Sequence, residues 1–289
     1  MRKQGKLTML TNLENNCKNM DDLINILRKK TICLFLGAGI PRILGFPNWS
    51  EFKDGLIEVF KLKKRDNNKD DRFWGELKSK ENFIEVFDVL SKVDSNLFVK
   101  EITETFNNNR LLSSEVNNNI FSPLLKLVNL NNNFIITTNV DRILEIILNF
   151  PGNVTSIYPE LELKRINYIH GRIDKPDTWI LTSDKYIEGY CNKQNKVGKC
   201  KEFLLKIFSE YDVLFLGCSI EEEIKRIIRD ISEDNKKSYF HIEIGSNSKI
   251  IKANYSNIKY GIKTIFYGSK QEEDYSNFLP FISNIVNQV

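Results

Sequence analysis

The sequence predicts an α/β fold with a doubly wound, mostly parallel sheet. Apolar runs of strand length recur along the chain, and segments with helical periodicity separate most of them. Glycine or a polar residue directly follows four of these runs. Such alternation is typical of an open sheet whose two faces are covered by helices.

Six buried strands are expected. They correspond to the apolar runs Thr31–Leu36, Phe134–Thr137, Ile166–Ile169, Val213–Leu216, Phe240–Ile244 and Ile262–Phe266. Apolar residues at three- and four-residue spacing predict the helices that cover this sheet. These helices are expected at Asp21–Arg28, Trp49–Phe60, Asp141–Leu148, Lys201–Tyr211, Glu221–Ile231 and Tyr275–Val286.

Residues 61–130 predict a helical layer inserted into the sheet domain. No strand is evident there, whereas Phe83–Leu90, Leu97–Phe106 and Ile120–Val128 have the 3.6-residue period. We expect residues 1–289 to form a single domain that includes this layer. Charge and the preference of Asn for turns predict loops at Lys61–Arg72, 107–109, 117–119 and 131–133.

The composition is that of a soluble globular protein, with 41% hydrophobic and 28% charged residues. Lys and Arg number 42 against 38 Asp and Glu, and the signs are interleaved, which argues against direct binding of nucleic acid. The N-terminus lacks a signal-peptide apolar stretch, and no segment approaches the roughly 20 apolar residues of a membrane span. We therefore expect a cytoplasmic protein that binds no membrane.

The cysteines and histidines predict neither a metal site nor a disulfide framework. The chain has five cysteines without a Cys-x-x-Cys pair, and two histidines. Cys33 lies in an apolar run and is expected in the core. Cys191 and Cys200 could meet, with a reduced pair as the expected state.

A glycine pair follows the first predicted strand. Gly37-Ala38-Gly39 allows a tight turn and can bring backbone N–H groups close to a phosphate. The spacing is not Gly-x-Gly-x-x-Gly, and a simple strand-to-helix turn that needs glycine would have the same sequence. A pyrophosphate site and a structural turn both remain open.

The next motif is Gly45-Phe46-Pro47-Asn48-Trp49. Asn48 is a possible helix N-cap, and Glu51 is placed three residues later as its reciprocal partner. A loop here could fold over the glycine turn. Trp49 is expected to pack in the core.

Three further predicted strands end in polar residues or glycine. Thr138-Asn139-Val140-Asp141 puts an amide and a carboxylate where open α/β sheets bind ligands, although both residue types also favour helix N-caps. His170-Gly171 and Gly217-Cys218-Ser219 follow two later strands. Each has a structural explanation alone, but four such strand ends meeting at one edge indicate a ligand site.

These motifs, taken in order, resemble the series found in the sirtuin superfamily. The resemblance covers about Thr31–Ser246 and is closest to the sirtuin-like NAD hydrolases of bacterial antiphage defence, whose later Asp-x-Tyr is echoed by Asp184-Lys185-Tyr186. It implies a Rossmann-like sheet and NAD as the substrate. The motifs that carry it are Gly37-Ala38-Gly39, Gly45-Phe46-Pro47-x-Trp49, Thr138-Asn139-x-Asp141, His170-Gly171 and Gly217-x-Ser219.

The resemblance also implies the roles of these residues. Asn139 and Asp141 would face the nicotinamide ribose and the carboxamide, and His170 would be the base. The strand end near Glu243–Asn247 would meet the adenine ribose. The residues implied to bind the nucleotide are Gly37, Ala38, Gly39, Thr138, Gly217 and Ser219.

Two departures from the sirtuin pattern affect what can be expected. Pro41 stands where a serine usually follows the Gly-Ala-Gly turn, so a hydroxyl and an N–H are lost from the phosphate site. The four zinc-binding cysteines of protein-deacylating sirtuins are not present after His170-Gly171. We therefore expect no zinc and no peptide-binding cleft.

The function implied is an NAD glycohydrolase that releases nicotinamide and ADP-ribose, as the NAD-depleting effector of an antiphage system that acts by abortive infection. His170 would accept a proton if its pKa is near the ordinary value for histidine. An NAD-dependent protein deacylase and a non-catalytic module that senses NAD or ADP-ribose are the alternatives. Because unregulated NAD hydrolysis is toxic, we expect a homo-oligomer or a complex with a separate sensor or regulatory protein.

Overall fold

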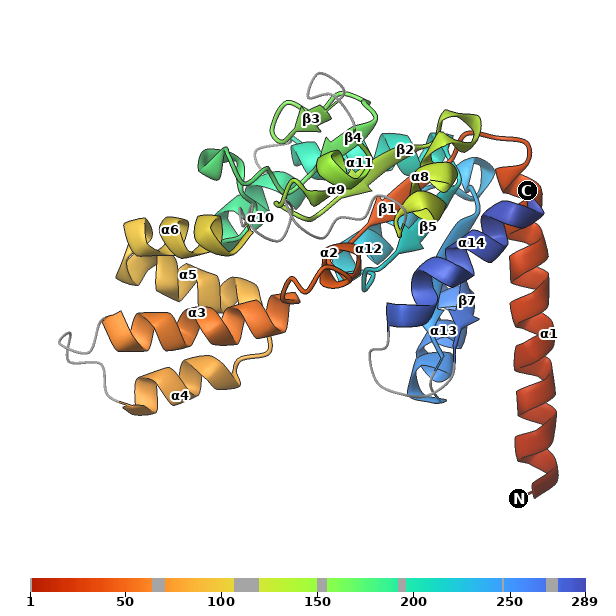
Figure 1. Cartoon of the computed structure of the whole chain (residues 1–289), viewed down its shortest axis with the longest axis horizontal. Coiled ribbons are helices and arrows are strands. Elements are labelled where there is room, and N and C mark those ends of the chain that lie inside the picture. The colour runs from red at the N-terminus through yellow and green to blue at the C-terminus, as the bar shows by residue number, and fades with distance from the viewer. Residues whose placement is uncertain are drawn as a thin grey trace.

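The protein is built around one seven-stranded sheet (Figure 1). The strand order is β3-β4-β2-β1-β5-β6-β7, and all neighbouring strands are parallel. The predicted α/β fold with a doubly wound sheet is therefore confirmed. The computed structural model describes residues 2–63, 71–106, 120–149, 155–191, 196–245, 247–268 and 275–289.

Six strands lie where the apolar runs predict them, and one was missed. The six are β1 (Cys33–Leu36), β2 (Phe134–Thr137), β4 (Ile166–Tyr168), β5 (Val213–Leu216), β6 (Tyr239–Ile244) and β7 (Ile262–Tyr267). The missed strand is β3 (Thr155–Ile157), an edge strand paired only with β4. Three residues are too short to show a periodicity.

All nine predicted helices are present, with shifted ends. They are α1 (Arg2–Leu27), α3 (Trp49–Lys63), α5 (Phe83–Val93), α6 (Ser95–Phe106), α8 (Ser122–Asn129), α9 (Ile143–Ile147), α11 (Lys199–Glu210), α12 (Glu222–Asp230) and α14 (Phe278–Gln288). The unpredicted helices are α2 (Gly39–Arg42), α4 (Asp71–Ser79), α10 (Ser183–Tyr190) and α13 (Asn247–Tyr260). Single 3-10 turns occupy Leu130–Asn132, Pro176–Thr178, Glu233–Asn235 and Tyr275–Asn277. Of the helices in the described ranges, none combines the length and the apolar character needed to cross a membrane.

Alternating strand residues face two separate cores, as expected for a parallel sheet covered on both faces. Leu34 and Leu36 of β1 pack in a core with residues of α1, α8, α9 and α14. Cys33 and Phe35 pack on the opposite face with residues of α11 and α12. The predicted burial of Cys33 is confirmed.

The helices between β1 and β2 lie in two places. Figure 1 shows α3, α4, α5 and α6 grouped at one end of the molecule, and their buried residues are continuous with one core of the sheet. Helix α8 instead packs against α14. Both ends of the loop expected at Lys61–Arg72 belong to helices, because α3 extends to Lys63 and α4 begins at Asp71, and residues 64–70 lie outside the described part of the chain. The expected loops at 107–109 and 117–119 lie outside the described residues.

Asparagine side chains tie α1 to the edge strand β7. Asn16 Oδ1 accepts a hydrogen bond from Phe266 N at 2.7 Å, and Asn16 Nδ2 donates to Phe266 O at 3.3 Å. Asn19 Nδ2 donates to Thr264 O at 3.0 Å. These amides pair with the backbone groups that an edge strand otherwise leaves exposed. The prediction of a helix starting at Asp21 missed this polar part of α1.

Candidate functional site

The predicted site lies at the carboxyl ends of β1 and β5, where the strand order reverses. β1 pairs with β2 on one side and with β5 on the other. The crevice at such a switch point is the usual ligand site of an open α/β sheet. The turns Gly37-Ala38-Gly39 and Gly217-Cys218-Ser219 leave these two strands next to each other.

The two glycine turns are in direct contact. Gly39 N donates a hydrogen bond to Gly217 O at 2.7 Å. A Cβ on Gly37 would lie 2.3 Å from Cys218 Cβ, and a Cβ on Gly39 would lie 2.7 Å from Gly217 Cα. Gly217 itself has a φ of +59°, a conformation that glycine adopts without steric cost. Close approach of the strand ends therefore explains these glycines structurally, while phosphate binding stays a prediction.

We expect Gly39→Ala to lower the free energy of unfolding by about 1–3 kcal/mol, because the added Cβ meets backbone atoms that cannot turn away. Gly55→Ala is the matched control: Gly55 lies within α3, and a Cβ there meets no atom within 4 Å. That control should raise the free energy of unfolding by about 0.5–1 kcal/mol through helix propensity. Urea denaturation measures both, and a Gly39→Ala protein as stable as the wild type would contradict the close packing.

A cavity of about 490 Å³ opens beside the glycine turns. This volume lies within the range of small-molecule and cofactor sites. Gly39 does not line the cavity, because it is buried against Gly217. The predicted nucleotide-binding residues that do line it are Gly37, Ala38, Thr138, Gly217 and Ser219.

Charged and aromatic side chains complete the cavity. Glu243 follows the end of the buried part of β6, and its Oε1 lies 3.3 Å from Lys249 Nζ. The Nε2 of His241 lies 2.9 Å from Cys218 O. For Glu243, position near the end of a predicted strand was the available sequence signal, whereas His241 lies within β6. Lining residues that the sequence analysis did not single out as ligand-binding include Trp49, Phe83, Cys218, Glu221, His241 and Lys249.

The loop before α3 is closed by the predicted capping box. Asn48 Oδ1 accepts from Glu51 N at 2.8 Å, and Asn48 N donates to Glu51 Oε2 at 3.0 Å. Arg42 adds a second partner, with Nη2 donating to Glu51 Oε1 at 3.0 Å. This arrangement fixes Trp49, which stacks on Phe83 with ring centroids 5.6 Å apart. The expected packing role of Trp49 is present, and the same residue lines the cavity.

Asn139 connects the ends of β1 and β2. Its Nδ2 donates to Gly37 O at 3.1 Å, and its backbone N donates to Thr137 Oγ1 at 3.1 Å. The side chain therefore reaches across to β1 and does not cap α9. The Asn139 Oδ1 is buried and has no hydrogen-bond partner within the described residues. An acceptor in that position is available to a ligand or a water molecule.

Asp141 binds the backbone at the start of α9, although the N-cap position itself is Arg142. Its Oδ1 accepts a hydrogen bond from Ile143 N at 3.0 Å, in the first turn of α9. The side chain is buried, and this burial raises the pKa of Asp141 to about 7. The carboxyl group is thus divided between its neutral and ionised forms near neutral pH.

His170 follows β4 and is buried against aromatic rings. Its Nε2 lies 2.7 Å from the hydroxyl of Tyr190. Burial lowers the pKa of His170 to about 3, so the near-neutral titration of an ordinary histidine is absent. The imidazole is therefore neutral at pH 7. Tyr190, its partner, was not a candidate in the sequence analysis.

The Asp184-Lys185-Tyr186 motif lies in α10 beside His170. The Tyr186 ring stacks on Tyr190 with centroids 4.7 Å apart, and its hydroxyl donates to Glu221 Oε2 at 2.9 Å. Burial raises the pKa of Glu221. Tyr186 thus joins a carboxylate of the large cavity to the His170–Tyr190 pair.

The structure separates the predicted catalytic residues from the large cavity. Asn139 and Asp141 line a second cavity of about 10 Å³, which also includes Trp49 and Phe106 in its wall. That volume holds about one water molecule and is too small for a nicotinamide ring. His170 lines neither cavity. Ala38 and Trp49 line both cavities, and Trp49 is the large side chain that the two walls share.

The described part of the chain has no cluster of three or more His, Cys, Asp or Glu side chains that could hold a metal ion. Cys191 is exposed and Cys200 is buried, and both are free thiols. The Sγ of Cys200 donates to Ile169 O at 3.1 Å. Cys191 and Cys200 are therefore not joined by a disulfide bond in the structure.

Comparison with known proteins supports the sirtuin resemblance for the second part of the chain. No curated protein matches the sequence. The family model of the SIR2-like domain matches residues 133–265, a segment that contains Asn139, Asp141, His170 and Gly217 but not the glycine turn after β1. Residues 133–265 are therefore similar to the SIR2-like domain, and the Rossmann-like parallel sheet is consistent with that similarity.

Proposed function

We propose that this protein is an NAD glycohydrolase that cleaves the bond between nicotinamide and ribose. The main support is the position of Asn139, whose amide holds the Gly37 carbonyl at the cavity wall while its Oδ1 is buried without a partner in the described residues. The SIR2-like match over residues 133–265 indicates chemistry on NAD. The products would be nicotinamide and ADP-ribose.

In this proposal the cavity of about 490 Å³ holds the ADP part of NAD. In the glycine turn after β1, Gly37 N and Gly39 N already donate to Leu216 O and Gly217 O, so Ala38 at the cavity wall would supply the backbone N–H for the pyrophosphate. Thr138 lies at the nucleotide, and Gly217 and Ser219 lie at the adenosine end. Glu243 is placed to accept hydrogen bonds from the adenine ribose.

The reaction requires little acid catalysis, because the cationic nicotinamide ring is a good leaving group. Water attacks C1′ of the ribose, the C–N bond breaks, and its electrons neutralise the departing ring. Asn139 orients the water or a ribose hydroxyl, and Asp141 contacts the carboxamide. The water becomes strongly acidic as it bonds to the cationic ribose carbon, so His170 can accept its proton in this proposal even though burial lowers the pKa of His170 to about 3.

The proposal also requires a change in conformation. The cavity beside Asn139 and Asp141 measures about 10 Å³, so the Trp49 or Phe106 side chain must move before the nicotinamide ring can enter. Such a requirement provides the off state that a toxic hydrolase needs. We infer that a homo-oligomer or a regulatory protein drives this opening, and the role in antiphage defence follows from the sequence resemblance alone.

Liquid chromatography of NAD incubated with the purified protein tests the proposal, with and without an acetylated peptide. We expect nicotinamide and free ADP-ribose in equal amounts, independent of peptide. An O-acyl product that depends on peptide would instead support the deacylase. NAD that stays intact in every assembly state and with every co-encoded protein, but still binds, would support the sensing module.

A further inference from the structure

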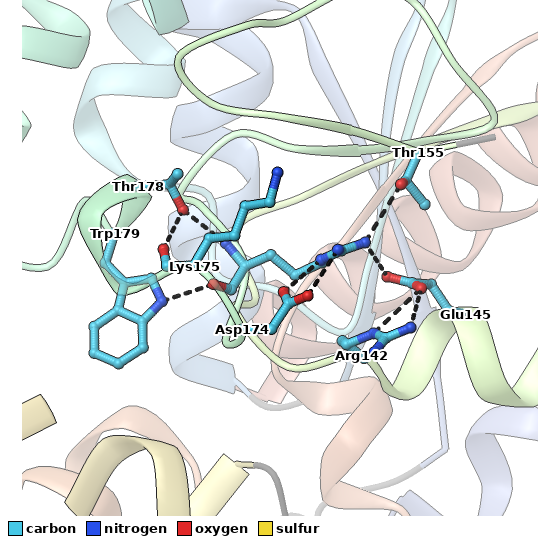
Figure 2. Close-up of polar contacts among 8 residues, drawn as sticks. Arg142, Glu145, Thr155, Asp174, Lys175, Thr178 and Trp179 are labelled. Atoms are coloured by element: carbon cyan, nitrogen blue, oxygen red, sulfur yellow. Dashed lines mark hydrogen bonds and ion pairs between the residues drawn. The ribbon is translucent and has the colours of Figure 1, made fainter. Parts of the chain in front are cut away.

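The Arg172 side chain contacts two other segments of the chain, α9 and β3 (Figure 2). Its guanidinium Nη1 lies 3.2 Å from Glu145 Oε1 on α9 and 3.4 Å from Thr155 Oγ1 on β3. Its Nε and Nη2 donate to the two carboxylate oxygens of Asp174 at 2.7 and 2.8 Å. Arg172 comes two residues after His170, whereas Glu145 comes four residues after Asp141. The Arg172–Glu145 pair therefore bridges the two loops that carry the proposed catalytic residues.

The Glu145 carboxylate needs a positively charged partner because it is buried. Its side chain is 4% exposed, and that of Arg172 is 12% exposed. Arg142 also contacts the carboxylate, with Nη2 3.0 Å from Oε2, but it lies on the same segment as Glu145 and is 45% exposed. Removing the partner of a buried carboxylate destabilises a protein far more than removing the partner of an exposed carboxylate. Of these two arginines, only Arg172 connects the loops.

The backbone around Arg172 is already fixed against the neighbouring loop. Ile173 N donates to Val140 O at 2.7 Å, which links the segment after His170 to the segment between Asn139 and Asp141. The indole Nε1 of Trp179 donates to Arg172 O at 2.9 Å. The guanidinium thus extends from a backbone that is held in place. The contact between Arg172 and Glu145 therefore couples the position of α9 to that of the loop that carries His170.

We propose that Arg172 is a positioning residue that holds His170 in place relative to Asn139 and Asp141 through its ion pair with Glu145. The proposal rests on the NAD glycohydrolase function described above. Neither Arg172 nor Glu145 lines the cavity for the nucleotide. The Arg172–Glu145 ion pair therefore acts on the rate of cleavage and leaves nucleotide affinity unchanged.

Arg172→Gln should lower kcat by about 10²-fold, the loss that a displacement of about 1 Å in a catalytic group can cause. The dissociation constant for ADP-ribose, measured by calorimetry, should stay within about twofold of the wild type because the cavity is untouched. Arg142→Gln is the matched control, since it removes the other arginine from the same carboxylate without opening the bridge. Arg172→Lys keeps a charge for Glu145 and should recover part of the kcat.

A second measurement does not depend on activity. The chain has only two histidines, so the imidazole NMR signals of His170 and His241 can be assigned by substituting one of them. Arg172→Gln should shift the His170 signals and leave those of His241 in place. Should Arg172→Gln fail to fold, Arg172→Lys and Glu145→Gln provide the same two readouts.

Wild-type protein that cleaves no NAD in any assembly would count against the proposed function. The His170 signals would still report whether the Arg172–Glu145 ion pair positions His170. Unshifted His170 signals in folded Arg172→Gln would overturn the positioning role, and so would an unchanged kcat. Equal losses of kcat in Arg142→Gln and Arg172→Gln would also overturn it, because general destabilisation would then explain the effect.

Discussion

His170→Ala is expected to reduce NAD cleavage by roughly 10²–10⁴-fold, the range typical of a general acid–base group. The imidazole is neutral and buried beside Tyr190, so its loss removes the proposed proton acceptor. The rate of nicotinamide release measures the effect, and circular dichroism checks the fold. His170→Gln is the matched variant, because it retains hydrogen-bonding capacity toward Tyr190 but cannot act as a base. Near-wild-type turnover in the Gln variant would assign His170 a structural role.

The pH dependence of the same reaction follows from the two buried groups. Because burial lowers the pKa of His170 to about 3, this residue stays neutral as the pH falls through 6.5 and produces no acid limb there. Burial raises the pKa of Asp141 to about 7, so its carboxyl group loses its proton as the pH rises through that value. A change in kcat/KM near pH 7 that disappears in Asp141→Asn would be the titration of Asp141.

The core of the fold could be predicted because the central strands of a parallel sheet are buried on both faces. Their sequences are continuous apolar runs, such as Cys33–Leu36 and Val213–Leu216. Two elements outside the centre of the sheet, β3 and α13, lack this signal. β3 has three residues, and α13 leaves Ile251, Tyr255 and Ile258 exposed, so its apolar residues do not mark one buried face.

The site could be predicted only as far as strand ends reveal it. Residues that follow β1, β2, β4 and β5 were found because parallel strands end at one edge of the sheet. The partners that determine their chemistry come from elsewhere in the chain. Tyr190 lies 20 residues beyond His170, and Arg172 meets a carboxylate 27 residues earlier. No local pattern encodes these contacts, nor the burial that makes His170 neutral.

The sequence pattern also could not predict the shape of the candidate site. Trp49 was expected in the core, and it does pack against Phe83. Its position in the walls of both cavities depends on how α3, α5 and α6 are arranged, which a helical periodicity does not specify. The proposal that an aromatic side chain moves before NAD cleavage therefore rests on the structure and could not be made from the sequence.

Asn139→Ala is expected to lower turnover by about 10²-fold or more, the loss seen when a positioned polar group at a reacting centre is removed. The buried Oδ1 is the proposed contact with water or the ribose, whereas Nδ2 holds the Gly37 carbonyl. Affinity for ADP-ribose, measured by calorimetry, should fall much less than kcat, because the cavity wall keeps its backbone groups.

Thr137→Val separates this chemical role from local stability. Its Oγ1 donates to Leu36 O at 2.8 Å and accepts from Asn139 N at 3.1 Å, so the substitution loosens the same strand end but keeps the Asn139 amide. We expect this control to lose stability while retaining most of its turnover per folded molecule. If Asn139→Ala instead resembles Thr137→Val, with lower stability and little change in kcat, the amide serves the packing of β1 against β2 and takes no part in cleavage.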